Sequence, residues 1–370
     1  MYRPVPYFSL GILFIMKFDE NRRDFLKKSI GAGLSLYGIT QFSLPILGTA
    51  EAKSTKPSVV IARDEKVIDK RFQIDPAVVR KMLDDSVIKL TGTKKAVDAW
   101  RELFRSDDIV GIKVNTLSGR RMSSSLEIVY AIVEGLKSAG VKEKNIIIWD
   151  KSDRDLESAG FQLNRKANND PRCYGTIPPI GYEKDIKMLG SIASRLSRIV
   201  SHCTAFVNVP VLKHHTMAGV TLSLKNWFGA INNPNKYHFD TSVEKKMVAG
   251  CNYIPDVNSL LFSSSGLDKK QPLIVCDALM AQYDMGPGYN PRRTWIYGGL
   301  MVARDPVALD RIGLEIIENK RREAGFDSLM GTDIQPDYIS IAADNFHDLG
   351  IDKRDDIKLI NAGNLEPELL

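Results

Sequence analysis

The sequence predicts an α/β protein with a mainly parallel sheet, helices on both faces of that sheet and two irregular insertions. The main observation is an alternation along the chain between short apolar segments and longer segments with apolar residues at helical spacing. This rhythm is typical of strand–helix–strand units, in which the strands run parallel and the helices cover the sheet. The second observation is size. The chain has 370 residues, 44% of them hydrophobic and 26% charged, which suits a single large domain over residues 53–370.

The expected strands are short apolar runs; they cover 58–62, 109–114, 146–149, 205–209, 273–276, 302–303, 338–342 and 357–360. The expected helices place apolar side chains three and four residues apart; they cover 76–90, 96–104, 125–139 and 306–322. Asp75 and Asp305 each precede a proline, which is typical of a helix start, because aspartate caps free backbone N–H groups and proline fits the first turn. Residues 162–190, rich in Asn, Pro and Gly, and residues 232–268 are the two irregular insertions.

Residues 1–52 have the pattern of a twin-arginine export signal. Paired arginines at 22–23 precede a moderately apolar stretch, and Ala50 and Ala52 give the small-x-small pattern of a cleavage site. Residues 1–15 are interpreted as an upstream mis-start, because Met16 begins a more typical signal. The alternative is a membrane anchor, which several glycines and a proline within the apolar stretch disfavour. We therefore expect a periplasmic protein that meets the twin-arginine export machinery and the membrane only during export.

The composition argues against several classes of function. The net charge is only +6 and no long run of Lys and Arg is present, so nucleic-acid binding is not expected. The four cysteines are far apart and form no Cys-x-x-Cys pair; they are Cys173, Cys203, Cys251 and Cys276. An iron–sulfur cluster or a four-thiolate zinc site usually includes such a pair, so neither is expected. The sequence also has no P-loop, no Gly-x-Gly-x-x-Gly motif and no His-Glu-x-x-His motif.

The densest group of reactive side chains lies in residues 208–231. Two of the five histidines, His214 and His215, are adjacent there, and Lys225 follows in the same segment. An imidazole with a pKa near about 6.5 takes or gives a proton near neutral pH, and a lysine ammonium holds a carboxylate or phosphate. We therefore predict that His214, His215 and Lys225 are catalytic residues acting on a small anionic ligand.

Polar residues also follow other predicted strands, and in a parallel α/β sheet all strand carboxyl ends lie at one edge. Residues far apart in the sequence are therefore expected to meet there. The predicted substrate-binding residues are Lys113, Asn115, Asn208, Lys213, Asn226, His238 and Gly286. Four aspartates could bind a divalent cation together with water; they are Asp150, Asp277, Asp284 and Asp310. The alternative is that each of these residues has a separate structural role, as a cap or a turn residue.

Residues 216–231 fit two conformations, of which we favour the helix. Apolar residues fit one face of a helix that Thr216 would cap and Gly229 would end. The free N–H groups at its start would form an anion site beside the histidines. Alternation between residues 220 and 225 also fits a strand. On a strand, adjacent histidines would face opposite ways, so at most one of them would serve the site.

Several of these motifs together resemble the bacterial and archaeal family called "domain of unknown function 362". The motifs are the strand with Lys113 and Asn115, Asn208-x-Pro-x-Leu-Lys-His214, Leu224-Lys225-Asn226-x-x-Gly229, His238, Asp277, Gly286-Pro287 and Asp305-Pro-Val-Ala-Leu-Asp310. The resemblance covers residues 58–345 and is to the members that twin-arginine signals export. It implies domain boundaries but no reaction. The ferredoxin-like cysteine motifs of other members are missing here, so no iron–sulfur role follows.

The sequence thus predicts an exported enzyme that acts on a small anionic substrate. Isomerisation, redox chemistry and hydrolysis all stay open. Folded export serves proteins that are loaded with a cofactor in the cytoplasm, so a divalent metal or an organic cofactor is compatible with this prediction. The alternative function is a non-catalytic periplasmic protein that binds a ligand or takes part in the maturation of a partner.

Overall fold

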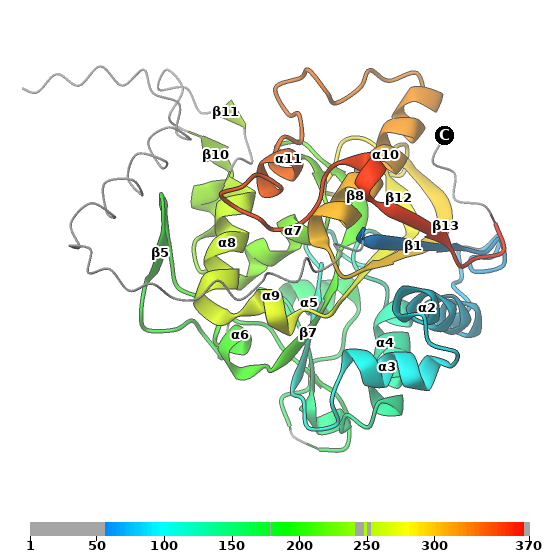
Figure 1. Ribbon diagram of the computed structural model, residues 1–370, viewed down its shortest axis with the longest axis vertical. Coiled ribbons are helices and arrows are strands. Elements are labelled where there is room, and N and C mark those ends of the chain that lie inside the picture. The colour runs from blue at the N-terminus through cyan, green and yellow to red at the C-terminus, as the bar shows by residue number, and fades with distance from the viewer. Residues whose placement is uncertain (1–55, 167, 178, 241–247, 250–252, 366–370) are drawn as a thin grey trace, which may run out of the picture. The chain divides into compact units, whose positions relative to one another are not determined.

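A ten-stranded sheet organises the part of the protein that the structure describes (Figure 1). The computed structural model describes residues 56–166, 168–177, 179–240, 248–249 and 253–365. The export signal predicted over residues 1–52 lies outside them. All described residues belong to one unit of the chain, Thr55–Leu370. None of the helices in the described residues is both long enough and apolar enough to cross a membrane.

The main path of the sheet runs β14-β1-β13-β12-β7-β2-β3-β4, and β8 joins it by pairing with β12. The strands are β1 (Ser58–Arg63), β2 (Val110–Val114), β3 (Ile146–Trp149), β4 (Arg172–Cys173), β7 (Ala205–Val209), β8 (Val211–His215), β9 (Gly219–Thr221), β12 (Leu273–Gln282), β13 (Thr294–Ala303) and β14 (Lys358–Asn361). Strands β12, β7, β2, β3 and β4 pair in parallel, as do β1 and β14. Antiparallel pairing joins β13 to β1 and β12, and β8 to β9. The predicted mainly parallel α/β sheet is confirmed.

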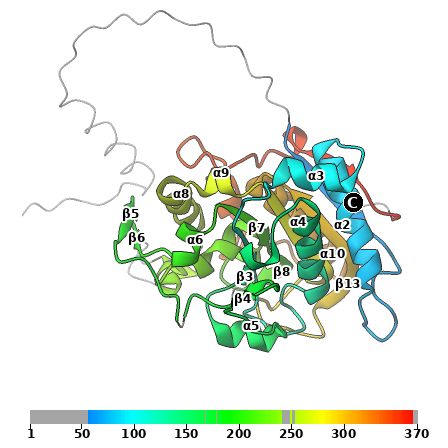
Figure 2. The same cartoon turned by 90° about the horizontal axis from the view of Figure 1, so that it is seen from below.

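Helices cover both faces of the sheet, as predicted (Figures 1 and 2). On one face lie α2 (Pro76–Thr91), α3 (Ala96–Leu103) and α4 (Leu126–Ser138); on the other lie α7 (Ser223–Asn226), α8 (Tyr253–Ser265), α10 (Pro306–Glu323) and α11 (Tyr338–Ala342). Alternation along β1 shows why: Val60 and Ala62 pack in the first core, and Val59 and Ile61 in the second. Asp75 caps α2 and Asp305 caps α10 through their side chains, as predicted.

The remaining elements are short; they are η2 (Glu143–Asn145), α5 (Asp153–Ala159), β5 (Lys187–Leu189), β6 (Ile192–Ser194), α6 (Arg198–His202), η3 (Trp227–Ala230), η4 (Pro234–Tyr237), β10 (Phe239–Asp240), β11 (Val248–Ala249), α9 (Leu267–Lys270) and η5 (Arg354–Asp356). The first predicted insertion, 162–190, is largely irregular where it is described. The second, 232–268, is only partly irregular, because α8 lies within it and packs in the core.

One predicted element is of the wrong type, and two predicted strands are present but longer than expected. Residues 338–342 form α11 and not a strand: Tyr338, Ile339 and Ala342 are buried while Ser340 is exposed, which is the spacing of one helix face. The strand predicted over 302–303 is the end of ten-residue β13, whose two adjacent glycines hid the pattern. The strand predicted to end at residue 276 continues to residue 282. Asp277 lies inside this strand, and its carboxylate accepts hydrogen bonds from two backbone N–H groups.

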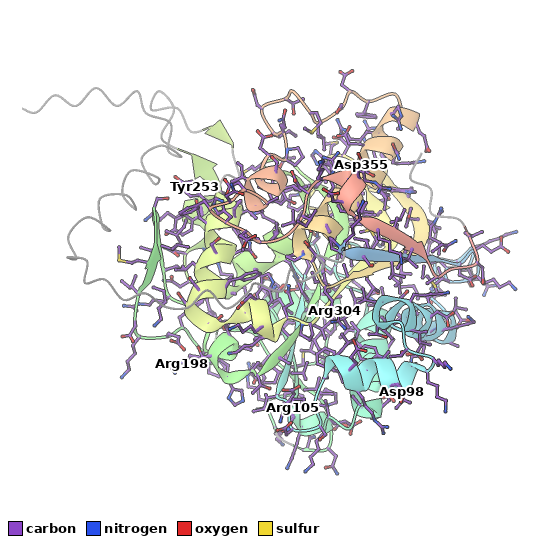
Figure 3. All side chains as sticks on the ribbon, in the orientation of Figure 1. Asp98, Arg105, Arg198, Tyr253, Arg304 and Asp355 are labelled. Atoms are coloured by element: carbon purple, nitrogen blue, oxygen red, sulfur yellow. The ribbon has the colours of Figure 1, made fainter. Side chains whose placement is uncertain are left out.

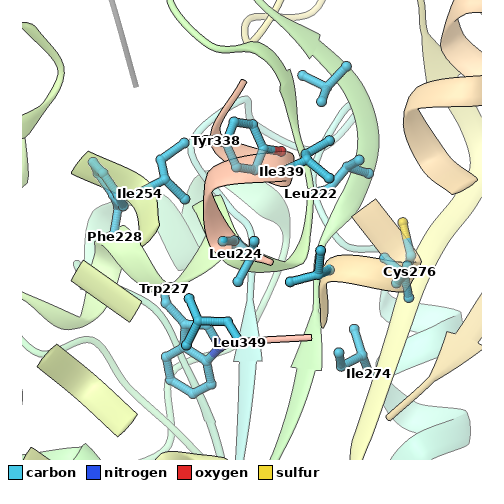
Figure 4. Close-up of a cluster of buried hydrophobic side chains, with 14 of the residues drawn as sticks. Leu222, Leu224, Trp227, Phe228, Ile254, Ile274, Cys276, Tyr338, Ile339 and Leu349 are labelled. Carbon is cyan, nitrogen blue, oxygen red and sulfur yellow. The ribbon is translucent and has the colours of Figure 1, made fainter. Parts of the chain in front are cut away.

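The segment that follows β9 is enclosed in the core (Figure 4). Leu224 and Trp227 pack there with Ile254 of α8, Ile274 of β12 and Tyr338 of α11, all of them buried. Trp227 also packs edge-on against a phenylalanine of β7 and donates its indole N–H to a glutamine at 2.7 Å. This packing fixes the short helix α7 on the carboxyl-end side of β7.

Candidate functional site

The carboxyl ends of neighbouring parallel strands bring distant polar residues together. In the register of the sheet, Lys113 of β2 lies beside Asn208 of β7 and Trp149 of β3, and Asp150 directly follows Trp149. The predicted convergence at one edge is therefore present for these residues. Arg105, labelled in Figure 3, is an exposed charged residue, whereas Lys113, Asn208 and Asp150 are buried.

Lys113 forms a buried ion pair with Asp150. Its Nζ donates to Asp150 Oδ1 and to Val114 O, each at 2.7 Å, and to Asn226 Oδ1 at 3.5 Å. Asp150 Oδ2 accepts from the backbone N–H and the hydroxyl of Thr116 at 2.9 and 2.6 Å. Lys113 is only 1% exposed. Its ammonium is thus directed to partners within the protein, where it joins β2 to the residues after β3.

Three asparagines form a chain of side-chain hydrogen bonds across the same edge. Asn226 Nδ2 donates to Asn208 Oδ1 at 2.8 Å and to Lys113 O at 3.2 Å. Its Oδ1 accepts from Asn115 Nδ2 at 3.2 Å. Asn208 Nδ2 donates to Ser223 O at 3.0 Å. The predicted amide residues therefore lie in one connected network, and this network links β2 and β7 to α7.

Lys213 is also buried, and three oxygens surround its ammonium. Nζ donates to Asn115 Oδ1, Ser118 Oγ and Met122 O, each at 2.9 Å. Burial lowers the pKa of Lys213 to about 7, against the attraction of two nearby carboxylates. Three acceptors match the three protons of an ammonium group. Lys213 therefore orders the loop that follows β2.

The predicted helix over residues 216–231 is wrong in its first half. Strands β8 and β9 form an antiparallel hairpin, in which His215 pairs with Gly219. Helix α7 begins only after this hairpin. Gly219 has φ 71°, and a Cβ at this position would lie 2.6 Å from Ile334 O, so both the turn and the close approach favour glycine. The alternating pattern, and not the helical one, describes this part of the chain.

His214 and His215 point to opposite faces of β8 because they are adjacent on a strand. His215 lies against His238, with ring centroids 6.0 Å apart and planes inclined by 23°. Lys225 Nζ donates to His238 Nε2 at 2.7 Å and lies 3.7 Å from the centroid of the Phe228 ring. We call His215, Lys225 and His238 the histidine–lysine cluster. It joins β8, α7 and the residue after η4.

Both imidazoles of the histidine–lysine cluster are held in defined neutral forms. His238 Nδ1 donates to Pro234 O at 2.9 Å, so its Nε2 is the acceptor for Lys225. His215 Nδ1 accepts from Met217 N at 3.1 Å, so its proton lies on Nε2. Burial, and after it the charge of Lys225, lower the pKa of His215 to about 2 and that of His238 to about 4. At neutral pH both rings are therefore uncharged bases.

His214 belongs to a second group of residues around the loop after β12. Its Nδ1 accepts from Gly286 N at 3.1 Å, and Thr216 N donates to Gly286 O at 3.0 Å. Its Nε2 lies 3.9 Å from Asp284 Oδ1, which Arg321 Nη1 holds at 3.0 Å. Among the described residues, His214 Nε2 has no hydrogen-bond partner. Burial lowers the pKa of His214 to about 4. His214 and Gly286 thus hold the loop onto β8.

The structure does not bring the four candidate metal ligands together. Their hydrogen-bond partners differ: Asp150 accepts from Lys113, Asp284 from Arg321, Asp277 from Ser125, and Asp310 from Ser223. Burial raises the pKa of Asp277, and it raises that of Asp310 to about 7. In the part of the chain that is described, no group of three or more His, Cys, Asp or Glu side chains is arranged to hold a metal ion. The geometry favours the alternative of separate caps and ion pairs.

Sequence reasoning missed three residues that shape the site. Phe228 fits the apolar helical pattern, so the sequence did not indicate that its ring contacts the ammonium group of Lys225. Ser118 and Arg321 lie outside every motif, yet they bind Lys213 and Asp284. The contacts of Ser118 and Arg321 join residues far apart in the chain, and a single sequence carries no signal for such pairs.

The fold and the site define an α/β protein with a buried group of lysines, asparagines and histidines at the carboxyl ends of its parallel strands. The chain belongs to the family described as domain of unknown function (DUF362), whose model matches residues 110–315. That range runs from β2 to the middle of α10 and includes every predicted site residue. No curated protein matches the sequence significantly.

Proposed function

We propose that the protein is an enzyme that carries out acid–base chemistry on a small anionic substrate. His215 and His238 are the proton-transferring groups, and Lys225 binds the anion. The observation that carries this proposal is the histidine–lysine cluster: two neutral imidazoles in contact with each other, one of which accepts a hydrogen bond from a lysine ammonium.

The electrostatics of the cluster couple ligand binding to base strength. Without a ligand, the charge of Lys225 contributes to the low pKa values of His215 and His238. A carboxylate or phosphate beside Lys225 offsets that charge and raises the pKa of an imidazole within about 4–6 Å. The imidazole then becomes a stronger base only when the substrate is present. This arrangement suits a general base that must take a proton from its own ligand.

Lys113 and Lys213 stabilise the framework of this site. Both are buried; Lys113 donates to Asp150 and to Asn226 of the asparagine network, and Lys213 donates to Asn115 and to the loop after β2. They keep that framework in place, while Lys225 supplies the charge at the cluster. His214, on the other face of β8, holds the loop at Gly286. Of the two adjacent histidines, His215 is therefore the proposed catalytic one.

A direct test combines ligand binding with turnover. The purified protein is incubated in D₂O with inorganic phosphate and with a panel of short hydroxy, keto and amino acids, and exchange or product formation is followed by proton NMR. We expect one class of anion to bind and react in the wild type, and His215→Gln to abolish turnover while retaining most of the affinity. The matched control is His202→Gln, an exposed histidine on α6.

Two outcomes contradict the enzyme proposal. If every anion that binds is returned unchanged, and substitutions at His215 and Lys225 lower affinity alone, the protein is a non-catalytic ligand-binding or maturation protein. If no anion on the panel binds, the cluster is a structural feature of the core. Either result would leave the fold and the family membership as they are.

We also propose export in the folded state through the twin-arginine pathway to the periplasm. The paired arginines at 22–23 and the small residues Ala50 and Ala52 support this. Replacing Arg22 and Arg23 by lysine should leave the protein in the cytoplasmic fraction of a bacterial host, whereas the unchanged chain should reach the periplasmic fraction. Equal distribution of the two forms would contradict export by this route.

A further inference from the structure

Helix α7 is too short to be stable by itself. It has four residues, Ser223–Asn226, and carries both Lys225 of the histidine–lysine cluster and Asn226 of the asparagine network. Starting a helix is unfavourable by a factor on the order of 10⁻³, and isolated helices shorter than about 12 residues are marginal in water. The position of Lys225 therefore depends on groups outside the helix.

Three buried polar side chains supply those groups. Asp310 Oδ1 accepts from Ser223 N at 2.7 Å and from Ser223 Oγ at 2.5 Å, and its Oδ2 accepts from Leu224 N at 3.2 Å. Asn258 Nδ2 donates to Leu224 O at 2.9 Å. Asn208 Nδ2 donates to Ser223 O at 3.0 Å. The N–H and C=O groups of the first two residues of α7 are thus all bound by side chains from α10, α8 and β7.

The helix that carries Asp310 is built to approach α7 closely. Gly313 lies one turn further along α10, and a Cβ at that position would be 2.8 Å from Leu222 Cδ1, just before α7. Asp310 also accepts from Tyr338 OH of α11 at 3.4 Å. Asp310, Asn258 and Asn208 are each 0% exposed. A fully buried carboxylate is costly to desolvate, so its retention here calls for a specific role.

We propose that Asp310, Asn258 and Asn208 form a positioning cradle for α7, in which the carboxylate of Asp310 sets the place of Lys225 beside His238. Asp310 is a positioning residue and not a metal ligand or a catalytic group. The inference rests on the proposed function, because Lys225 is the proposed anion-binding group. Its test has a readout that does not need the substrate.

The readout is the imidazole titration of His238, followed by NMR in Asp310→Asn. In the pH range where His238 titrates, Asp310, whose pKa is about 7, is largely protonated in the wild type, so the direct electrostatic effect of the substitution on His238 is small. Displacing Lys225 removes a positive charge from His238 and admits water, so the pKa of His238, about 4 in the wild type, should rise by about one unit or more. A purely structural role predicts no rise.

The matched control is Asp305→Ala. Asp305 is the cap of the same helix and accepts from the backbone N–H groups of Val307 and Ala308 at 2.8 Å and of Ile351 at 3.0 Å, and none of these partners lies on α7. Its loss should lower stability and leave the His238 titration unchanged. A milder variant, Ser223→Ala, removes one hydrogen bond to Asp310 and keeps both backbone N–H bonds. It should shift the His238 pKa in the same direction by less, and it carries the test if Asp310→Asn does not fold.

The outcomes separate this inference from the proposed function. A rise in the His238 pKa in Asp310→Asn or Ser223→Ala, but not in Asp305→Ala, supports the cradle. An unchanged or lowered pKa, or equal shifts in all three variants, overturns it. Affinity for inorganic phosphate is measured on the same samples. If the wild type binds no anion while the titration shifts as expected, the cradle stands and the proposed function fails.

Discussion

Lys225 and His238 share a hydrogen bond of 2.7 Å in which a lysine ammonium donates to a neutral imidazole. The direction of this bond is fixed, because the other ring nitrogen of His238 donates to Pro234 O at 2.9 Å. A cation held against a neutral base in a buried place raises the free energy of protonating that base. A bound anion offsets the charge of Lys225 and lowers this free energy, so the protonation of His238 depends on anion binding.

Replacing Lys225 by methionine removes the charge and keeps most of the side-chain volume. We expect the pKa of His238 and of His215 to rise, each by about one unit, and affinity for small anions to be lost. The measurement is an NMR titration of the histidine rings. Lys236→Met is the control, since Lys236 is close in sequence but exposed, and its ring titrations should match the wild type. Unchanged titrations in Lys225→Met would show that burial alone lowers these pKa values.

The Lys113–Asp150 pair should behave as a coupled buried unit. Lys113→Met leaves Asp150 with its hydrogen bonds from Thr116 but without its countercharge, and the expected loss of stability is about 3–5 kcal/mol. The double variant Lys113→Met/Asp150→Asn should lose less than the sum of the two single variants. Urea unfolding of the four proteins gives the coupling free energy. Additivity within about 0.5 kcal/mol would mean that the two residues act independently.

Two glycines in the loop after β12 provide a matched pair for the packing of that loop on β8. A Cβ at Gly286 would lie 1.8 Å from His214 O, whereas a Cβ at Gly288 would meet nothing within 4 Å. Gly286→Ala should therefore destabilise the protein by about 1–3 kcal/mol through backbone displacement. Gly288→Ala should change stability by less than about 0.5 kcal/mol. Thermal unfolding of both variants decides this, and equal losses would contradict the close approach at Gly286.

His347 should give the protein a pH-dependent contribution to stability. Its ring lies between Asp344, 2.9 Å from Nδ1, and Asp256, 3.3 Å from Nε2. Burial lowers the pKa of His347, but the hydrogen bonds and charges of the two carboxylates outweigh burial and raise it. A raised folded pKa means that the stabilisation is complete below the unfolded pKa of about 6.5 and is lost as pH rises through the folded pKa.

His347→Gln isolates this contribution. The free energy of unfolding of the wild type should exceed that of the variant by about 1–3 kcal/mol near pH 6, and the difference should shrink as the pH rises through the folded pKa. Denaturant unfolding at a series of pH values measures both curves. Parallel curves over that range would mean that the ring is neutral between its two carboxylates.

The sequence indicated correctly where β2, β3 and β7 end, at residues 114, 149 and 209. Polar residues that follow apolar runs in parallel strands must meet at one edge, and Lys113, Asn208 and Asp150 do so. The capping prediction for Asp305 also holds, since capping acts within a few residues. Local rules of this kind need no knowledge of distant partners.

The rest depends on contacts that no local pattern encodes. The alternation of the segment after His215 competed with an equally good helical spacing, and only the antiparallel pairing with β8 decides between them. Asp310 is the last residue of the motif that begins at Asp305. Its hydrogen-bond partners, Ser223 and Leu224, lie on a different helix, α7. The orientation of Lys213 toward oxygens of the protein likewise follows from the loop that packs over it.

The most direct test of the account is proton uptake on anion binding. Calorimetry of inorganic phosphate, or of the tightest anion on the panel, in buffers of different ionisation enthalpy gives the number of protons taken up at each pH. Since the pKa of His238 without ligand is about 4 and an adjacent anion raises it by about 1–3 units, uptake near pH 5 should be about 0.4–0.9 proton. Uptake should vanish near pH 8 and in Lys225→Met. Binding without proton uptake near pH 5, after correction for ionisation of the anion itself, would contradict the coupling between Lys225 and the two imidazoles.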